Sequence, residues 1–340
     1  MNYPFDLSIA WFIIVGILLA GYAILDGFDL GVGMLHLFIK GDRQRRVLLN
    51  SIGPVWDGNE VWLLVGGGAL FAAFPDVYAT VFSGFYIPFF LLLAALIFRA
   101  VAIEFRSKEP GPRWRSFWDG AFSVASFLIA LLAGVALGNM VVGIPIGADR
   151  EYQGGFFNLL NPYALLIGVT TVALFMMHGA IYLVLKTEGD VQEQAKKWVF
   201  GTIVFFAICY FAATGATLLF AEHMAERLRS NAWLMLVPLL NMLVAFNIPR
   251  EIYRKQYGLA FLSSCLNIAL LLSLFGIGMF PNLVSSQPNP EYSLTAYNAA
   301  ASEASLTIMF SIALLGMPFV LAYTASIYWV FRGKVRSLHY

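Results

Sequence analysis

Apolar stretches long enough to cross a lipid bilayer follow one another along the whole chain of 340 residues. Apolar residues make up 60% of the sequence and charged residues only 12%, whereas soluble domains contain about 25% charged residues. A crossing helix needs about 20 consecutive apolar residues, and its backbone hydrogen bonds are all internal. The sequence therefore predicts an all-α polytopic membrane protein in which residues 1–340 form a single integral membrane domain.

The apolar runs predict nine transmembrane helices. The seventh run is the shortest and contains Pro238 and Asn241. Only Pro75 and Asp76 separate the second run from the third, which predicts a tight turn there. The nine expected helices cover residues 7–38, 52–74, 77–101, 117–142, 159–185, 198–220, 232–248, 259–280 and 306–331.

Basic residues are distributed unevenly among the connecting segments. Every second segment, beginning with residues 40–50, is rich in Lys and Arg, and these segments together hold 18 of the 21 basic residues. Because Lys and Arg accumulate on the cytoplasmic side of a membrane, we predict the N-terminus outside and the C-terminus in the cytoplasm. That orientation requires an odd number of helices, which agrees with nine.

Asp26 and Asp29 are the only charged residues of the first apolar run. An ionised carboxylate at the bilayer centre costs about 2.5–3.5 kcal/mol on insertion scales, and two carboxylates three residues apart lie on one face of a helix. Such a pair must face protein or water. It indicates either proton or ion transfer, or a structural contact with a neighbouring helix or subunit.

Other charged residues of the first three runs lie toward the predicted cytoplasmic side. Asp57 and Glu60 are again three residues apart, near the start of the second run, and Arg99, Glu104 and Lys108 lie near the end of the third. A chain of titratable side chains leading inward from the cytoplasm is what proton uptake requires. These residues are therefore candidates for a proton pathway.

The same charges also have a purely structural interpretation. Arg99, Arg106 and Lys108 would then extend to the membrane interface as cytoplasmic anchors. Glu104 would pair with one of them, and Asp57 would stabilise the positive end of its helix dipole.

Glycine and histidine positions in the expected spans favour packing roles. Gly27, Gly31 and Gly33 are small enough to permit close helix contact. A haem with two axial histidines needs both on facing helices at matching depth, and only His36 and His178 lie within the spans. We interpret both as hydrogen-bonded packing residues. The two cysteines lack CxxC spacing, so neither a zinc site nor a disulfide framework is expected, and a net charge of +1 indicates no nucleic-acid partner.

Several segments match one known family. The segments AILDGFDLGVG (residues 23–33) and NSIGPVWDGNEVWL (residues 50–63) resemble subunit II of cytochrome bd-type quinol oxidases. Shorter matches follow at residues 67–75, 82–86, 98–108, 134–139 and 157–163, and the second half is similar in layout with weaker motifs. The resemblance extends over essentially the whole chain.

The resemblance implies a haem-free subunit of nine helices, arranged as two four-helix bundles plus one peripheral helix, in the cytoplasmic (inner) membrane of a prokaryote. Its partner, subunit I, would carry two b-type haems and haem d, oxidise quinol and reduce oxygen to water with cytoplasmic protons. A small accessory membrane subunit and a structural quinone or phospholipid are further expected partners.

The resemblance also implies roles for individual residues, with no catalytic residue and no metal ligand in this chain. The positions that match the family's proton route are Asp57, Glu104, Lys108 and Tyr340. The residues expected at an interface, or as secondary relays, are Asp26, Asp29, Glu60 and Arg99.

Two functions of other classes are alternatives: a secondary transporter that binds a cation through the same carboxylates, and a purely structural assembly subunit. Transporters often have broken helices and midplane polar groups in both halves, whereas the second half of this chain has no charged residue in its helix cores. Purification of a haem-containing complex with a second large membrane subunit would favour the oxidase, and a colourless homomer would exclude it.

Overall fold

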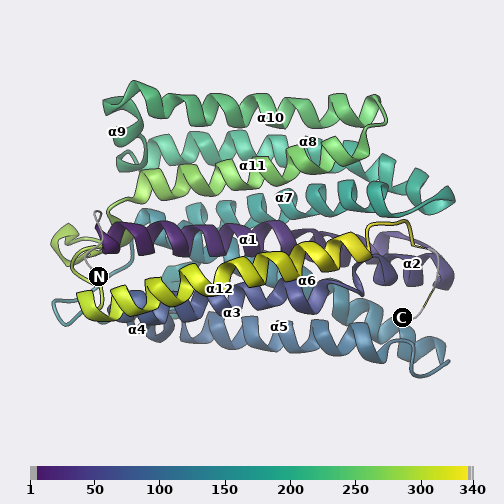
Figure 1. The fold of residues 1–340 in the computed structure, drawn as a ribbon, viewed down its shortest axis with the longest axis horizontal. Helices are drawn as coiled ribbons and strands as arrows, with labels where there is room; N and C mark the ends of the chain where they lie inside the picture. The colour runs from purple at the N-terminus through teal and green to yellow at the C-terminus, as the bar shows by residue number, and fades with distance from the viewer. Residues whose placement is uncertain (1–5, 336–337, 339–340) are drawn as a thin grey trace.

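The computed structural model describes residues 6–335 and Leu338. Long helices running side by side form an elongated body (Figure 1). Within the described residues, eight segments are long and apolar enough to cross a membrane: Leu7–Phe38, Tyr86–Phe105, Pro112–Val142, Pro162–Lys186, Gly189–Phe220, Ala232–Tyr253, Tyr257–Met279 and Glu303–Val330.

The long helices are α1 (Leu7–Leu35), α3 (Trp56–Ala73), α5 (Tyr86–Phe105), α6 (Pro112–Val142), α7 (Pro162–Lys186), α8 (Gly189–Phe220), α10 (Leu236–Tyr253), α11 (Tyr257–Met279) and α12 (Glu303–Val330). The short ones are α2 (Asp42–Ile52), α4 (Pro75–Gly84) and α9 (His223–Ser230), with 3-10 turns at His36–Phe38, Phe156–Leu160, Ala232–Met235 and Pro290–Tyr292. Strands β1 (Asn282–Val284) and β2 (Leu294–Thr295) pair antiparallel in the connection before α12.

Local sequence signals explain several helix starts. The Asp6 side chain accepts a hydrogen bond from the Ser8 amide at 2.8 Å, and Asn161 accepts one from the Ala164 amide at 2.8 Å. These side chains satisfy amide groups that a helix start leaves without partners. Proline, whose missing N–H costs nothing at this position, begins α4, α6 and α7.

The prediction of one helix over residues 77–101 is wrong. Helix α4 ends at Gly84 and α5 begins at Tyr86, because Phe85 leaves the helical conformation at φ −96° and ψ 23°. The Phe85 ring is buried in an apolar cluster that also contains Phe74 and Ile146. Pro75 and Asp76, where the sequence predicted a tight turn, form the first turn of α4, and the break between α3 and α4 lies one residue earlier, at Phe74.

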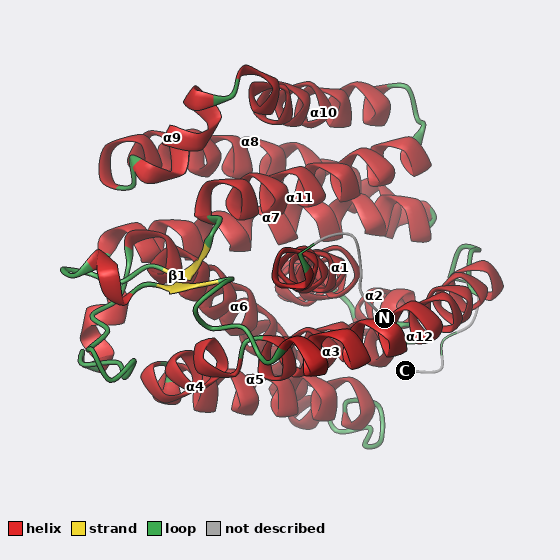
Figure 2. Ribbon diagram, turned by 60° about the vertical axis from the view of Figure 1, so that its left-hand side comes forward, coloured by secondary structure: helices red, strands yellow, loops and turns green. Residues whose placement is uncertain are grey.

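Helix α1 occupies the centre of the fold. It contacts α3, α6, α7, α11 and α12, and Figure 2 shows it between the α7–α8–α10–α11 group and the group that includes α3 and α5. Helix α12 lies at the periphery, and Leu306 is its one buried residue. Asp26 and Asp29 are among the buried residues in the C-terminal half of α1.

Helices α1 and α7 approach each other closely through glycine. A Cβ added to Gly31 would lie 2.8 Å from the Gly179 Cα and would also collide with the Phe175 carbonyl oxygen. Both obstacles are backbone atoms that cannot rotate away. The interpretation of Gly31 as a close-contact residue is therefore confirmed.

Gly31→Ala is expected to destabilise the protein, because the new methyl group meets backbone atoms of α7. Overpacking of this kind costs about 1–3 kcal/mol. The thermal midpoint of the purified protein measures the loss. Gly16→Ala is the matched control, since Gly16 lies on the same helix with no atom within 4 Å of the added Cβ. Equal midpoints for the two variants would contradict the close approach.

Candidate functional site

Arg99 of α5 lies in the interior, where it meets α1 and α3. Its side chain and that of Asp26 are both fully buried. Arg99 Nη1 donates to Asp26 Oδ2 at 2.9 Å, and Nη2 donates to Asp26 Oδ1. This bidentate geometry gives the strongest class of hydrogen-bonded ion pair. The interpretation of Arg99 as an interfacial anchor is therefore wrong.

Two further carboxylates surround the same guanidinium. Glu60 Oε2 lies 3.5 Å from Arg99 Nη1, and Asp29 Oδ2 lies 4.0 Å from Nη2. The Asp29 side chain is fully buried, whereas that of Glu60 is 22% exposed. Glu60 is thus the carboxylate through which this group reaches the surface of the chain.

A chain of hydrogen bonds connects the peripheral helix α12 to the same place. The Tyr328 hydroxyl donates to Asn59 Oδ1 at 2.8 Å, and the Asn59 amide donates to Asp29 Oδ2 at 2.7 Å. Sequence reasoning missed both residues. Asn59 stands inside the identified motif beside Glu60, but Tyr328 lies in an apolar run with no distinguishing signal. We define the Arg99 cluster as Asp26, Asp29, Asn59, Glu60, Arg99 and Tyr328.

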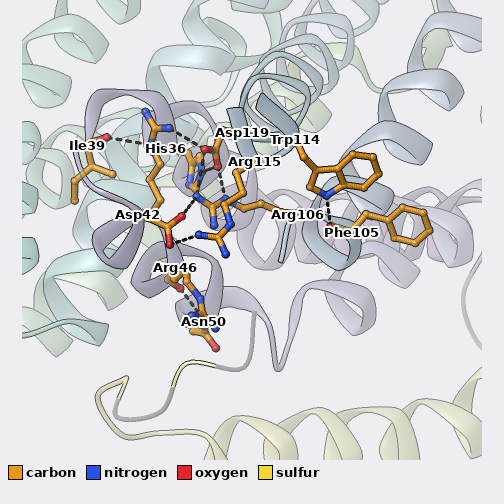
Figure 3. Close-up of polar contacts among 11 residues, drawn as sticks. His36, Ile39, Asp42, Arg46, Asn50, Phe105, Arg106, Trp114, Arg115 and Asp119 are labelled. Atoms are coloured by element: carbon orange, nitrogen blue, oxygen red, sulfur yellow. Dashed lines mark hydrogen bonds and ion pairs between the residues drawn. The ribbon is translucent and has the colours of Figure 1, made fainter. Parts of the chain in front are cut away.

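A second ionic network lies beside α2, at one end of the long helices (Figures 1 and 3). Its centre is Asp119 of α6, whose side chain is 2% exposed. The Asp119 carboxylate accepts hydrogen bonds from His36 Nε2 at 2.5 Å, Arg106 Nε at 2.5 Å and Arg45 Nη1 at 2.8 Å. Sequence reasoning missed Asp119, although it is the single charged residue of the expected span 117–142.

Asp42 extends this network toward the surface. Its carboxylate accepts from Arg106 Nη2 at 2.9 Å and from Arg115 Nη1 at 3.0 Å. Burial alone would lower the pKa of Arg106, but its hydrogen bonds to Asp119 and Asp42 and their negative charges raise it. Arg106 is therefore a buried ionic partner, and its interpretation as an interfacial anchor is also wrong. We define the Asp119 cluster as His36, Asp42, Arg45, Arg106, Arg115 and Asp119.

The residues predicted for a proton route lie on the surface at the same end of the molecule. Asp57 stands in the first turn of α3, and Glu104 and Lys108 lie at the end of α5 and just beyond it. All three are exposed, and none has a side-chain hydrogen bond or ion pair within residues 6–335 and Leu338. The expected pairing of Glu104 with a basic neighbour is thus not seen. Tyr340 lies outside the described residues.

The histidines within the spans are engaged inside the chain. His178 Nε2 donates to the Ile24 carbonyl at 3.0 Å, and Nδ1 accepts from the Ser264 hydroxyl at 2.8 Å. The ring also stacks on Phe261, with 5.0 Å between centroids. The interpretation of His178 as a hydrogen-bonded packing residue is confirmed. In the part of the chain that the structure describes, no group of three or more His, Cys, Asp or Glu residues could hold a metal ion.

Comparisons with known proteins agree with the sequence motifs. Residues 7–331 match the family described as "Cytochrome bd terminal oxidase subunit II". The chain belongs to this family. As a subunit II family member, it is one subunit of a membrane-bound terminal oxidase complex, and the resemblance that its motifs indicated is confirmed.

Individual relatives match over nearly their full length. "Cytochrome bd-I ubiquinol oxidase subunit 2" of Escherichia coli (strain K12) is 37% identical, with 97% of this chain and 95% of that protein covered. "Cytochrome bd ubiquinol oxidase subunit 2" of Bacillus subtilis (strain 168) is 38% identical, with 96% of each covered. A chain in the structure of the bd oxidase from Geobacillus thermodenitrificans has the same fold. Its TM-score is 0.80 at 17% identity, over 96% of this chain and 98% of that one.

Asp26→Asn is expected to destabilise the assembled protein strongly, because it leaves Arg99 as a buried cation without its bidentate partner. Breaking a buried pair on one side costs about 3–5 kcal/mol. Glu104→Gln, which changes an exposed carboxylate of α5, is expected to cost less than about 0.5 kcal/mol. The thermal midpoints of the two variants measure the difference, and similar midpoints would contradict a structural role for the pair.

Proposed function

We propose that this chain is the haem-free subunit II of a cytochrome bd-type quinol oxidase, and that it stabilises subunit I and supplies it with cytoplasmic protons. Subunit I would hold two b-type haems and haem d, oxidise quinol and reduce oxygen to water. The observation that carries the proton role is the Arg99 cluster. It is a buried ionic group that reaches the surface through Glu60, one helical turn from the exposed Asp57.

The proposed route uses the exposed charged residues at the end of the molecule that carries α2. Glu104 and Lys108 would form its entrance, with Tyr340 as a further member, and Asp57 would relay the proton. A carboxylate beside a span is costly where it faces lipid. We therefore place subunit I over the face of α3 and α5 that carries Asp57 and Glu104, where it would cover both.

Each cluster has its own part in this proposal. The Asp119 cluster joins α2, α6 and the segment after α5, so it holds the entrance residues in place. The Arg99 cluster joins α1, α3 and α5 in the interior, and Glu60 is its partly exposed carboxylate. Asp26 and Asp29 would then be inner partners of Arg99 and secondary relays.

We propose nine membrane crossings, with α3 added to the eight apolar segments. Asp57, Asn59 and Glu60 make the start of α3 polar, which explains why composition alone does not select it. Helices α1 and α12 run in the same direction (Figure 1), which supports an odd number of crossings. The distribution of Lys and Arg is what favours the N-terminus outside. All of residues 1–340 would form one membrane domain in the cytoplasmic membrane of a prokaryote.

We propose two bundles, joined by the contacts of α7 with α1 and α6. Helices α1, α3, α5 and α6 would form the first bundle, α7, α8, α10 and α11 the second, and α12 the peripheral helix. The engaged nitrogens of His178 support haem ligation by subunit I rather than by this chain. A structural quinone or phospholipid and a small accessory subunit complete the proposed complex.

The two alternative functions differ in what supports them. A cation transporter would need polar groups in both halves, whereas every Asp, Glu and Arg of the two clusters lies on α1, α2, α3, α5 or α6 or in the segment after α5. A purely structural subunit differs from our proposal in one respect, because Asp57 would then carry no proton.

Asp57→Asn is expected to slow quinol oxidase turnover and proton uptake by the purified complex together, because Asn cannot take up and release a proton. We expect both rates to fall by roughly tenfold to a hundredfold, which is less than or equal to the smallest effect typical of direct acid–base catalysis. Stopped-flow uptake with a pH dye and oxygen consumption measure the two rates. Asp190→Asn, an exposed carboxylate at the start of α8, should leave both unchanged. Full rates in Asp57→Asn would remove the relay role while leaving the family assignment intact.

A further inference from the structure

The Arg99 cluster contains more carboxylates than its guanidinium can neutralise. Asp26, Asp29 and Glu60 all have an oxygen within 4.0 Å of an Arg99 nitrogen. No second basic side chain forms an ion pair with any of them in the described part of the chain. Two negative charges would remain in a largely buried site if all three were ionised, and an uncompensated buried charge is costly.

Asp29 is the carboxylate with the poorest support for a charge. Asp26 takes both terminal nitrogens of Arg99, and Asp29 stays at 4.0 Å. Asp29 Oδ2 accepts the Asn59 amide at 2.7 Å, but Oδ1 is fully buried and has no hydrogen-bond partner. An ionised carboxylate can only accept hydrogen bonds, whereas the neutral acid carries an O–H that can donate one.

We propose that Asp29 stores one exchangeable proton and is a neutral carboxylic acid in the resting subunit. Uptake joins one proton to the carboxylate, and release returns it, with no electron or other group exchanged. The Arg99 guanidinium lies between Asp29 and Glu60, whose side chain is 22% exposed. This proton therefore exchanges with the surroundings of the chain by way of Glu60.

A monovalent cation fits the same site less well. Arg99 already supplies the positive charge beside Asp26, and the Asn59 amide group, a donor, points at Asp29 Oδ2. A cation bound to Asp29 would be repelled by the Arg99 guanidinium and would compete with the neutral Asn59 amide for Oδ2, whereas a proton on Oδ1 displaces neither group. The described neighbours that act electrostatically on Asp29 are Asp26, Glu60, Arg99, Tyr182 and Tyr328.

The stored proton deepens the secondary-relay role proposed for Asp29 and rests on that part of the proposed function, but it does not depend on the relay through Asp57. Asp57 is exposed on α3, whereas Asp29 is buried on α1. A result that removes the relay role of Asp57 leaves the protonation of Asp29 unaffected, and the reverse is also true.

Infrared spectroscopy of the purified complex tests the proposal, because the carbonyl band of a protonated carboxylic acid is separate from that of a carboxylate and shifts in heavy water. We expect one such band that loses intensity as the pH is raised. Asp29→Asn should remove it, and Asp149→Asn, an exposed carboxylate outside the cluster, should not. Asp29→Asn should also assemble at close to full yield, since Asn resembles the neutral acid, whereas Asp26→Asn should not.

Three results would overturn the proposal. The first is a wild-type complex that lacks the carboxylic acid band. A complex that lacks this band and whose carboxylate bands change with sodium or potassium would count as the same result. The second is a band that survives Asp29→Asn and disappears in Glu60→Gln, which would place the proton on Glu60. If Asp29→Asn does not assemble, wild-type protein isotopically labelled at the aspartate carboxyl carbon decides. The band must then shift with the label, and an unshifted band is the third contradicting result.

Discussion

The bidentate ion pair between Arg99 and Asp26 is the interaction on which the arrangement of the first half of the chain depends. Both side chains are fully buried, and they join α5 to α1. A buried ion pair adds little net stability over apolar residues of the same shape, but separating its partners is costly. The pair therefore acts by fixing which helices meet and at what register, and Glu60 adds α3 to the same contact.

The two ionic clusters stabilise different parts of this bundle. The Arg99 cluster lies in the interior and reaches α12 through Asn59 and Tyr328. The Asp119 cluster ties the end of the bundle where basic residues accumulate. Between them they fix the surface that carries the exposed charged residues. By contrast, the contact of α1 with α7 depends on glycine and on the hydrogen bonds of His178.

Much of this could be predicted from the sequence, because hydropathy and basic residues report directly on membrane crossings. The apolar runs predicted most helix ends to within five residues. Helix α8 is one exception, because it begins at Gly189, nine residues before the expected span, with polar first turns. The other exception lies near Phe85, where burial of one aromatic side chain interrupts a continuous run. Asp26 and Asp29 stood out for the same reason, since carboxylates are rare in such runs.

The partners of those carboxylates could not be predicted. Arg99 and Arg106 lie close to a helix end, where a long basic side chain can extend outward or turn inward, and local sequence does not decide between the two. Tyr328 is almost 300 residues from Asp29, and no spacing rule connects them. Asp119 was overlooked because a single acidic residue near a helix end resembles an ordinary boundary residue.

A double-mutant cycle on Arg99 and Asp26 tests the central claim most directly. Arg99→Met and Asp26→Leu would be made singly and together in the assembled complex, with thermal stability as the readout. The claim predicts that the double variant is more stable than either single variant, with a coupling of at least about 2 kcal/mol. Single effects that simply add in the double variant would contradict it.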